Sequence, residues 1–323
     1  MKSLSIPIIY QDHHLLIVNK PAHLVIHPSY KNTEGTMWDV LLEYLAEQGT
    51  DDWQPPTLPD EPAWSGAPLH IQEMLREKRT ERLWKEDGLL PRPCLLHRLD
   101  KDTSGVVALA RTARSRRYII AQFHDYTIDK RYLAVVQKGA FEWSRPRTVF
   151  AVTRQNDVGA AFRVSEWENA HSNPFASLGD DELVLNGPLQ RDPDDRRRCI
   201  VGADGADSQS ATTVVKVLAT SEAFILLEVR PITGRTHQIR AHLAALGYAI
   251  VGDAMYAQPA EPGTPSAALT RQFLHAYSLK LRRYPDGERC RFVAPLAGDL
   301  LLWTKAYFPE GLGALNAKFT LSS

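Results

Sequence analysis

Residues 97–105, with the sequence HRLDKDTSG, gather two carboxylates, two cations, a histidine and two hydroxyls between apolar flanks. The next five residues, VVALA at 106–110, predict a buried strand. A carboxylate at such a position is costly to bury unless a cation and hydrogen-bond donors accompany it. We therefore expect Asp100 to be either a paired structural group or a reactive one.

This run resembles the catalytic motif of the RluA-type pseudouridine synthases, which isomerise uridine in structured RNA. The resemblance extends, in family order, from about residue 8 to residue 300. Its other segments are VNKPA at 18–22 with HP at 27–28, KRYLA at 130–134 with Gly139, TGRTHQIRAHL at 233–243 with GD at 252–253, LHAYSL at 274–279, and AP at 294–295. One departure is Ala22-His23, which replaces the family's usual small residue and glycine.

The pattern of elements indicates an α+β fold. Strand-like and helix-like segments occur without the regular βαβ alternation of a Rossmann fold, so we expect a mixed, largely antiparallel sheet with flanking helices and a central catalytic cleft. We predict one catalytic domain over residues 1–310, with two subdomains, a tail at 311–323 and no accessory RNA-binding domain before it. Residues 50–92 are longer than the family's usual link and indicate an insertion, including a charged helix at 69–85.

The resemblance implies an isomerisation that breaks the bond between uracil and ribose and rejoins the base through carbon five. Asp100 is the catalytic aspartate by that resemblance, and it can act as a nucleophile on the anomeric carbon or as a base on the adjacent carbon. An ionised carboxylate in a closed pocket needs a cation. Our candidate is Arg235, at the start of a helix predicted over residues 231–246, and the resemblance assigns it the same role.

Tyr132 lies on a predicted strand that is otherwise rich in aliphatic residues. An arbitrary strand tyrosine most often packs in the core. The match to the family's KxYxA segment instead implies that its ring stacks on the flipped uracil and that its hydroxyl serves in deprotonation of carbon five. By the same analogy Leu279 lines the uracil pocket, although core packing is the alternative.

The charges balance, with 38 basic and 38 acidic residues, which is a caution for an RNA-binding protein because phosphate contacts favour a basic surface. The basic residues are nevertheless unevenly placed. Candidate RNA contacts are Arg98, Arg111, Arg114, Arg116, Arg117 and Lys130. A solvated helix face, or an ion pair for Arg98, is the alternative for any one of them.

No cofactor or metal is expected. His237 and His242 are five residues apart, which places them off one helix face, and the HExxH pattern is absent. Hydrogen bonding within the packed helix is the simpler interpretation of both. Three isolated cysteines without a CxxC pair favour a reducing compartment.

We therefore expect a monomeric, cytoplasmic RNA pseudouridine synthase without a membrane span, acting on a stem-loop of ribosomal or transfer RNA. The alternative is a catalytically silent RNA-binding or ribosome-assembly factor on the same fold. A glycosidase with paired carboxylates would also act at a sugar, but it would leave residues 233–243 unexplained.

Overall fold

The computed structural model describes residues 6–26, 35–47, 62–64, 66–138, 151–154, 162–163, 175, 182–202 and 207–320. Within these residues, twelve strands form one sheet with the order β1-β2-β4-β13-β5-β12-β11-β8-β6-β7, while β3 pairs with β4 and β14 with β13. The strands are β1 (Ile8–Gln11), β2 (Leu15–Lys20), β3 (Leu89–Leu95), β4 (Ser104–Thr112), β5 (Asp129–Gln137), β6 (Ala151–Arg154), β7 (Phe162–Arg163), β8 (Glu182–Asn186), β11 (Thr212–Thr220), β12 (Phe224–Pro231), β13 (Leu274–Arg282) and β14 (Arg289–Val293). A separate hairpin is formed by β9 (Leu189–Arg191) and β10 (Cys199–Val201).

The predicted mixed, largely antiparallel sheet is confirmed. Among the described pairings only β4 and β13 run parallel, and they join the N-terminal strands to the rest of the sheet. His275 lies opposite Ser104 in this pair. The connection therefore brings the start of β4, which directly follows the HRLDKDT segment, to the middle of the sheet.

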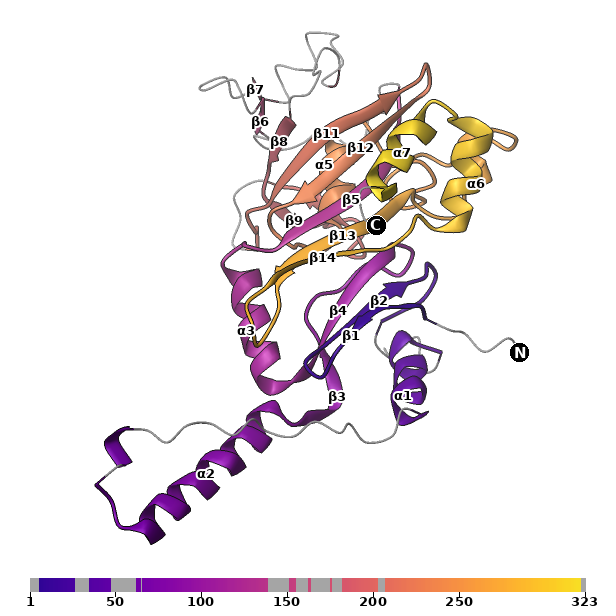
Figure 1. Ribbon diagram of the computed structural model, residues 1–323. Helices are drawn as coiled ribbons and strands as arrows, with labels where there is room; N and C mark the ends of the chain where they lie inside the picture. The colour runs from indigo at the N-terminus through magenta and orange to yellow at the C-terminus, as the bar shows by residue number, and fades with distance from the viewer. Residues whose placement is uncertain are drawn as a thin grey trace.

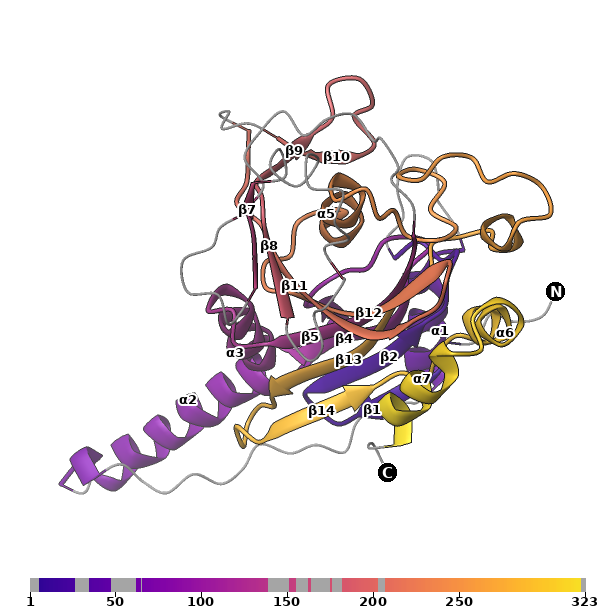
Figure 2. The same cartoon turned by 90° about the horizontal axis from the view of Figure 1, so that it is seen from above.

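Figures 1 and 2 show how the helices are arranged around the sheet. They are α1 (Met37–Glu47), α2 (Leu69–Asp87), α3 (Ala113–His124), α5 (Gln238–Ala245), α6 (Gly298–Tyr307) and α7 (Gly311–Thr320), with short 3₁₀ turns η1 (Pro62–Trp64) and η2 (Pro265–Ala268). In Figure 2, α5 lies on one face of β11 and β12, whereas α6 and α7 lie toward the other. The long helix α2 projects away from the body of the molecule.

Strand β12 shows why both faces must be covered. Ile225, Leu227 and Val229 alternate with Leu226 and Glu228, as the sequence predicts, and all are buried. Glu228 points to the α7 side, where Lys318 Nζ donates to it at 2.7 Å. The segment that we set apart as a C-terminal tail thus packs onto the sheet as α7 at residues 311–320, with Leu315 buried.

Two expected elements differ from the structure in their bounds. The charged helix expected over residues 69–85 is confirmed as α2, while most of residues 50–68 lie outside the described residues. The helix expected over 231–246 begins only at Gln238, because β12 runs to Pro231 and residues 232–237 form a loop that ends at His237 with φ of 54°. Gly247, with φ of 79°, follows the helix as predicted. Among the described residues, no helix is long and apolar enough to cross a membrane.

Candidate active site

Two buried cations, Lys20 and Arg271, hold the loop at residues 97–103 in place. Lys20 is 0% exposed, and its Nζ donates to the carbonyls of Lys101 at 2.8 Å, Thr103 at 2.9 Å and Pro21 at 2.9 Å. Burial lowers the pKa of Lys20 to about 7, against the opposing charge of Asp102. These contacts satisfy backbone groups that would otherwise be orphaned, so the loop is fixed before any substrate binds.

The second cation, Arg271, also donates a hydrogen bond to this loop. Its Nη1 donates to the carbonyl of Asp102 at 3.1 Å, and its Nε donates to Asp299, at the start of α6, at 2.6 Å. Gln272 Nε2 donates to Thr103 Oγ1 at 3.2 Å. The Asp102 backbone and the Thr103 hydroxyl are therefore held in place by the two residues that precede Phe273 and β13.

Gly105 explains why the motif ends in glycine. Its φ is +124°, and a Cβ built there would lie 2.2 Å from the carbonyl oxygen of Ala276 on β13. Only a residue without a side chain can adopt this backbone and let β4 approach β13 so closely. The glycine therefore sets the distance between the loop at residues 97–103 and the centre of the sheet.

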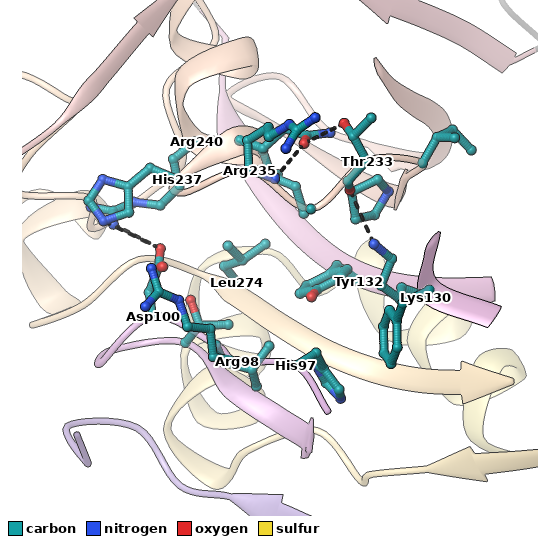
Figure 3. A pocket seen from close by; sticks show the side chains of 18 of the residues that line it. His97, Arg98, Asp100, Lys130, Tyr132, Thr233, Arg235, His237, Arg240 and Leu274 are labelled. Atoms are coloured by element: carbon teal, nitrogen blue, oxygen red, sulfur yellow. Dashed lines mark hydrogen bonds and ion pairs between the residues drawn. The ribbon is translucent and has the colours of Figure 1, made fainter. Parts of the chain in front are cut away.

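A cavity of about 390 Å³ opens beside this loop. Its size suits a small ligand or a single base. The cavity brings together five residues predicted from the sequence, which come from the 97–103 loop, β5 and the loop before α5: Arg98, Asp100, Lys130, Tyr132 and Arg235. Figure 3 shows Asp100 at one end of the cavity and Tyr132 with Lys130 at the other.

The predicted pairing of Asp100 with Arg235 is wrong. Arg240 Nη1 donates to Asp100 Oδ2 at 3.1 Å, whereas Arg235 Nε donates to the carbonyl of Ser210 at 3.2 Å. The cause is the late start of α5, which leaves Arg235 in the preceding loop and puts Arg240 in the first turn. Arg235 still lines the cavity, but a different guanidinium meets the carboxylate.

Arg240 is itself held by a buried carboxylate. Asp253 accepts from Arg240 Nε at 2.7 Å and from Nη2 at 2.8 Å, and its side chain is 0% exposed. Asp253 also accepts from the backbone N–H groups of Met255 at 3.0 Å and Tyr256 at 3.2 Å. Burial acts to lower the pKa of Arg240, but the hydrogen bonds and charges of Asp253 and Asp100 raise it above its ordinary value. Arg240 is thus a fixed cation beside Asp100.

Tyr132 lies on β5, where its ring enters the cavity (Figure 3). Burial and the charge of Asp100 raise the pKa of its hydroxyl well above the ordinary value, so the group is protonated at neutral pH. Lys130, two residues earlier, donates from Nζ to the carbonyl of Thr233 at 3.1 Å, and burial lowers its pKa to about 8. His97 is neutral, because burial lowers its pKa to about 3.

The cluster of candidate RNA-binding arginines at residues 111–117 does not line the cavity. Arg111 is buried, with 8% exposure, and donates to the carbonyl of Asp12. Arg114 pairs with Glu86 and Asp87 of α2. Of this cluster, Arg116 and Arg117 remain exposed, and Arg117 lies 3.8 Å from Glu86. The cluster sits at the end of β4 remote from Ser104, about 25 Å along the strand, so an RNA contact there would be distant from the cavity.

Leu279 also differs from its predicted place. It is 2% exposed and packs with Ile128, Leu281 and Phe292 in a hydrophobic cluster. Leu274, at the start of the same strand, lines the cavity instead. The core-packing alternative is therefore correct for Leu279.

The histidines of the 233–243 segment are hydrogen-bonded within the fold. His242 lies 2.9 Å from Thr213 Oγ1 and 3.0 Å from the carbonyl of Gly187. His237 Nδ1 lies 3.1 Å from Tyr256 Oη. Among the described residues, no group of three or more His, Cys, Asp or Glu side chains could hold a metal ion.

A family model described as RNA pseudouridylate synthase matches residues 14–245. The chain belongs to this family. It is an isomerase that converts uridine to pseudouridine in RNA.

Named relatives agree with this assignment. Ribosomal large subunit pseudouridine synthase D of Zymomonas mobilis is 27% identical, over 94% of this chain and 73% of the relative. The protein of the same name from Xanthomonas campestris is 29% identical, over 93% of this chain and 68% of the relative. An uncharacterised RNA pseudouridine synthase of Chloroflexus aurantiacus is 32% identical, over 87% of this chain and 63% of the relative.

A solved structure supports the fold. Human RNA Pseudouridylate Synthase Domain Containing 4 superposes with a TM-score of 0.53 at 20% identity, covering 93% of this chain and 92% of that one. The predicted pseudouridine-synthase fold is therefore confirmed.

Proposed function

We propose that Asp100 carries out the ribose chemistry of this synthase and that the target is a uridine in a stem-loop of large-subunit ribosomal RNA or of transfer RNA. The role of Asp100 is supported by its contact with Arg240. Arg240 is a cation fixed by Asp253, and it lies in a cavity large enough for one base. Ribosomal RNA is favoured by the names of the two bacterial relatives above.

The proposed reaction is an isomerisation that needs no co-reactant. The bond from uracil N1 to C1′ breaks, a bond from C5 to C1′ forms, and the proton on C5 is lost while N1 gains one. Asp100 acts as a nucleophile on C1′ or as a base at C2′. Arg240 holds and orients the carboxylate in either case.

Tyr132 and Lys130 are proposed to face the detached base. Tyr132 is protonated, so its hydroxyl can donate to the base, while its ring offers a flat surface for stacking. Arg98, exposed at the cavity, is proposed to hold a phosphate or to fill the gap that the extruded nucleotide leaves. Arg116 and Arg117 are proposed as secondary contacts to more distant RNA.

The proposal extends to a monomer in the cytoplasm. A cavity lined by residues of one chain supports a monomer as sufficient for catalysis. The described cysteines, Cys94, Cys199 and Cys290, are all free, which supports a reducing compartment.

The test has two parts. Site-resolved pseudouridine mapping of total RNA with and without the gene should show one or a few uridines that lose modification. A hairpin that carries such a uridine is then converted by purified protein in a single turnover. We expect Asp100→Asn to lower that rate by at least about 1,000-fold while RNA affinity and the unfolding temperature stay near wild type. Near-normal conversion by Asp100→Asn would refute the assigned role, and unchanged maps would refute the substrate.

A further inference from the structure

His237 has an unusual backbone for a histidine at the entrance to a helix. It precedes α5 with φ of 54° and ψ of 18°, a left-handed conformation that costs about 1 kcal/mol or more for a residue other than glycine. Its side chain makes no capping hydrogen bond to the helix, so capping does not explain the residue. The side chain is instead directed toward Asp100 (Figure 3).

The hydrogen bonds around Tyr256 determine which ring nitrogen of His237 carries the proton. Tyr256 Oη accepts from the backbone N–H of Cys199 at 2.7 Å and donates its own hydrogen to the carbonyl of Cys199 at 2.9 Å. The Cys199 carbonyl is the nearer of the two acceptors for the Tyr256 hydrogen, so we assign the remaining contact, 3.1 Å from Tyr256 Oη to His237 Nδ1, to an N–H of the imidazole. His237 is thus protonated on Nδ1, and Nε2 keeps a free lone pair.

That lone pair faces the catalytic carboxylate. Nε2 lies 3.8 Å from Asp100 Oδ2, too far for a hydrogen bond, and the His237 side chain is 13% exposed. Burial lowers the pKa of His237; Asp100 and Asp253 oppose that shift, and Arg240 and Arg191 add to it. The imidazole is therefore neutral at physiological pH. Within the part of the chain that the structure describes, Nε2 is an acceptor without a donor.

The ribose of an internal nucleotide offers one donor to such a group. Its 3′ and 5′ oxygens are esterified and its ring oxygen has no hydrogen, so the 2′-hydroxyl is the sole sugar donor. Whether Asp100 acts at C1′ or C2′, that hydroxyl lies on or next to the attacked carbon. A group 3.8 Å from the Asp100 oxygen is thus within reach of it.

We propose that His237 is a specificity-determining residue whose unprotonated Nε2 accepts a hydrogen bond from the 2′-hydroxyl of the target uridine. The proposal rests on the action of Asp100 at the ribose. Tyr256 is the positioning residue, because its hydroxyl fixes the tautomer of His237. This contact would distinguish a ribonucleotide from a deoxyribonucleotide at the reacting position.

A double-substitution cycle tests the contact. Single-turnover rates are measured for the mapped hairpin with either uridine or 2′-deoxyuridine at the target, for wild type and for each variant. Removing the hydroxyl also changes the sugar's intrinsic reactivity, but that change is common to every protein and cancels in the ratio. We expect deoxy substitution to slow wild type about five- to tenfold more than it slows His237→Asn.

Three variants separate the contact from a structural role. Asparagine tolerates the left-handed backbone, so His237→Asn should fold, but its side chain is too short to reach. His237→Gln can place an amide oxygen near the Nε2 position and should keep part of the coupling. Arg235→Gln is the matched control, because Arg235 lines the same cavity but bonds to Ser210; it should show the full wild-type coupling.

Additive effects of His237→Asn and deoxy substitution would overturn the proposal. The proposal would also be overturned if His237→Asn were additive with 2′-deoxyuridine but coupled to 3-methyluridine. In that case His237 would contact the N3–H of uracil and not the 2′-hydroxyl. Conversion of the unmodified hairpin by wild type reports separately on the proposed function. The tautomer is checked without any RNA, by the ¹⁵N shifts of the imidazole, and a proton on Nε2 at neutral pH would also overturn it.

Discussion

Arg235 and Arg240 lie five residues apart in one segment, yet only Arg240 contacts Asp100. Arg240 binds Asp253 through two nitrogens and Asp100 through a third contact. A lysine cannot make this set of contacts, because it presents one nitrogen and no planar fork. The geometry of the carboxylate therefore depends on a guanidinium at this position.

We expect Arg240→Lys to lower kcat/KM on the order of 100-fold, since a small misplacement of a reacting group is enough for such a loss. Arg235→Lys, the matched substitution in the neighbouring loop, should change kcat/KM by less than about threefold, because it keeps the charge near an exposed carbonyl contact. Steady-state kinetics on the mapped hairpin compares the two. Equal losses would show that the pairing with Asp100 is not what the reaction requires.

At this scale the motifs predict which residues line the cavity better than they predict the partners of those residues. Asp100 and Tyr132 follow from short, specific segments, and both line the cavity. The choice between Arg235 and Arg240 depends on where a helix begins, and no Ser, Thr, Asp or Asn directly precedes Gln238 to mark that start. Leu279 and Leu274 lie on one strand, and the bulge in the pairing of β13 with β5 between His275 and Ser278 is not visible in the sequence.

At the scale of elements, the parallel contact of β4 with β13 positions the loop at residues 97–103. The approach is possible because Gly105 has no side chain against Ala276. The sequence predicts both strands from their apolar runs, but their parallel pairing joins segments about 170 residues apart and leaves no local pattern. The contacts of Lys20 and Arg271 with the loop are equally non-local.

We expect Gly105→Ala to destabilise the fold by about 3 kcal/mol or more, because the added methyl meets the Ala276 carbonyl and the backbone angle is unfavourable for alanine. Gly263→Ala is the control, because its φ is +85° but nothing lies within 4 Å of the added carbon. Urea denaturation of both proteins measures the difference. A loss at Gly105 no larger than that at Gly263 would mean that β4 can shift to accept a side chain.

Helix α5 makes the fold sensitive to acid. Burial lowers the pKa of His242 from 6.5 to about 4, so the unfolded chain binds a proton between these pH values that the folded chain excludes. The contribution of neutral His242 is therefore complete above pH 6.5 and is lost as the pH falls toward 4. His275, whose pKa burial also lowers to about 4, adds to the same loss.

We expect the free energy of unfolding to fall between pH 6.5 and pH 4, and to fall less steeply in His242→Gln, which has no proton to take up. Urea denaturation at several pH values provides both slopes. His124→Gln, at the end of α3, serves as the control because that side chain is exposed. A slope in His242→Gln that matches wild type would assign the acid sensitivity to other groups.

The whole molecule combines a compact sheet with one projecting helix (Figure 1). Helix α7 belongs to the body, because Leu315 is 1% exposed and Lys318 pairs with buried Glu228. Helix α2 is different, because its last turns join it to the body through Leu83, Glu86 and Asp87. Farther out, Arg79 lies over the Trp64 ring of η1, 5.4 Å from its centroid. No residue of α2 lines the cavity among the described residues.

We expect replacement of residues 69–79, the outer turns of α2, by a short Gly-Ser link to change the free energy of unfolding by less than about 1 kcal/mol, since surface changes away from packed groups cost little. Conversion of a minimal hairpin should also stay within about twofold of wild type, because the chemistry depends on groups held by β4, β5 and α5.

Deletion of residues 311–323 is the matched truncation. It should lower the free energy of unfolding by several kcal/mol, because it exposes the surface around Tyr277 and leaves Glu228 with one cation fewer. Urea denaturation and single-turnover assays on both truncated proteins measure these effects. If the α2 truncation instead slowed conversion of a longer structured RNA while leaving the hairpin unaffected, the helix would carry part of the substrate outside the cavity.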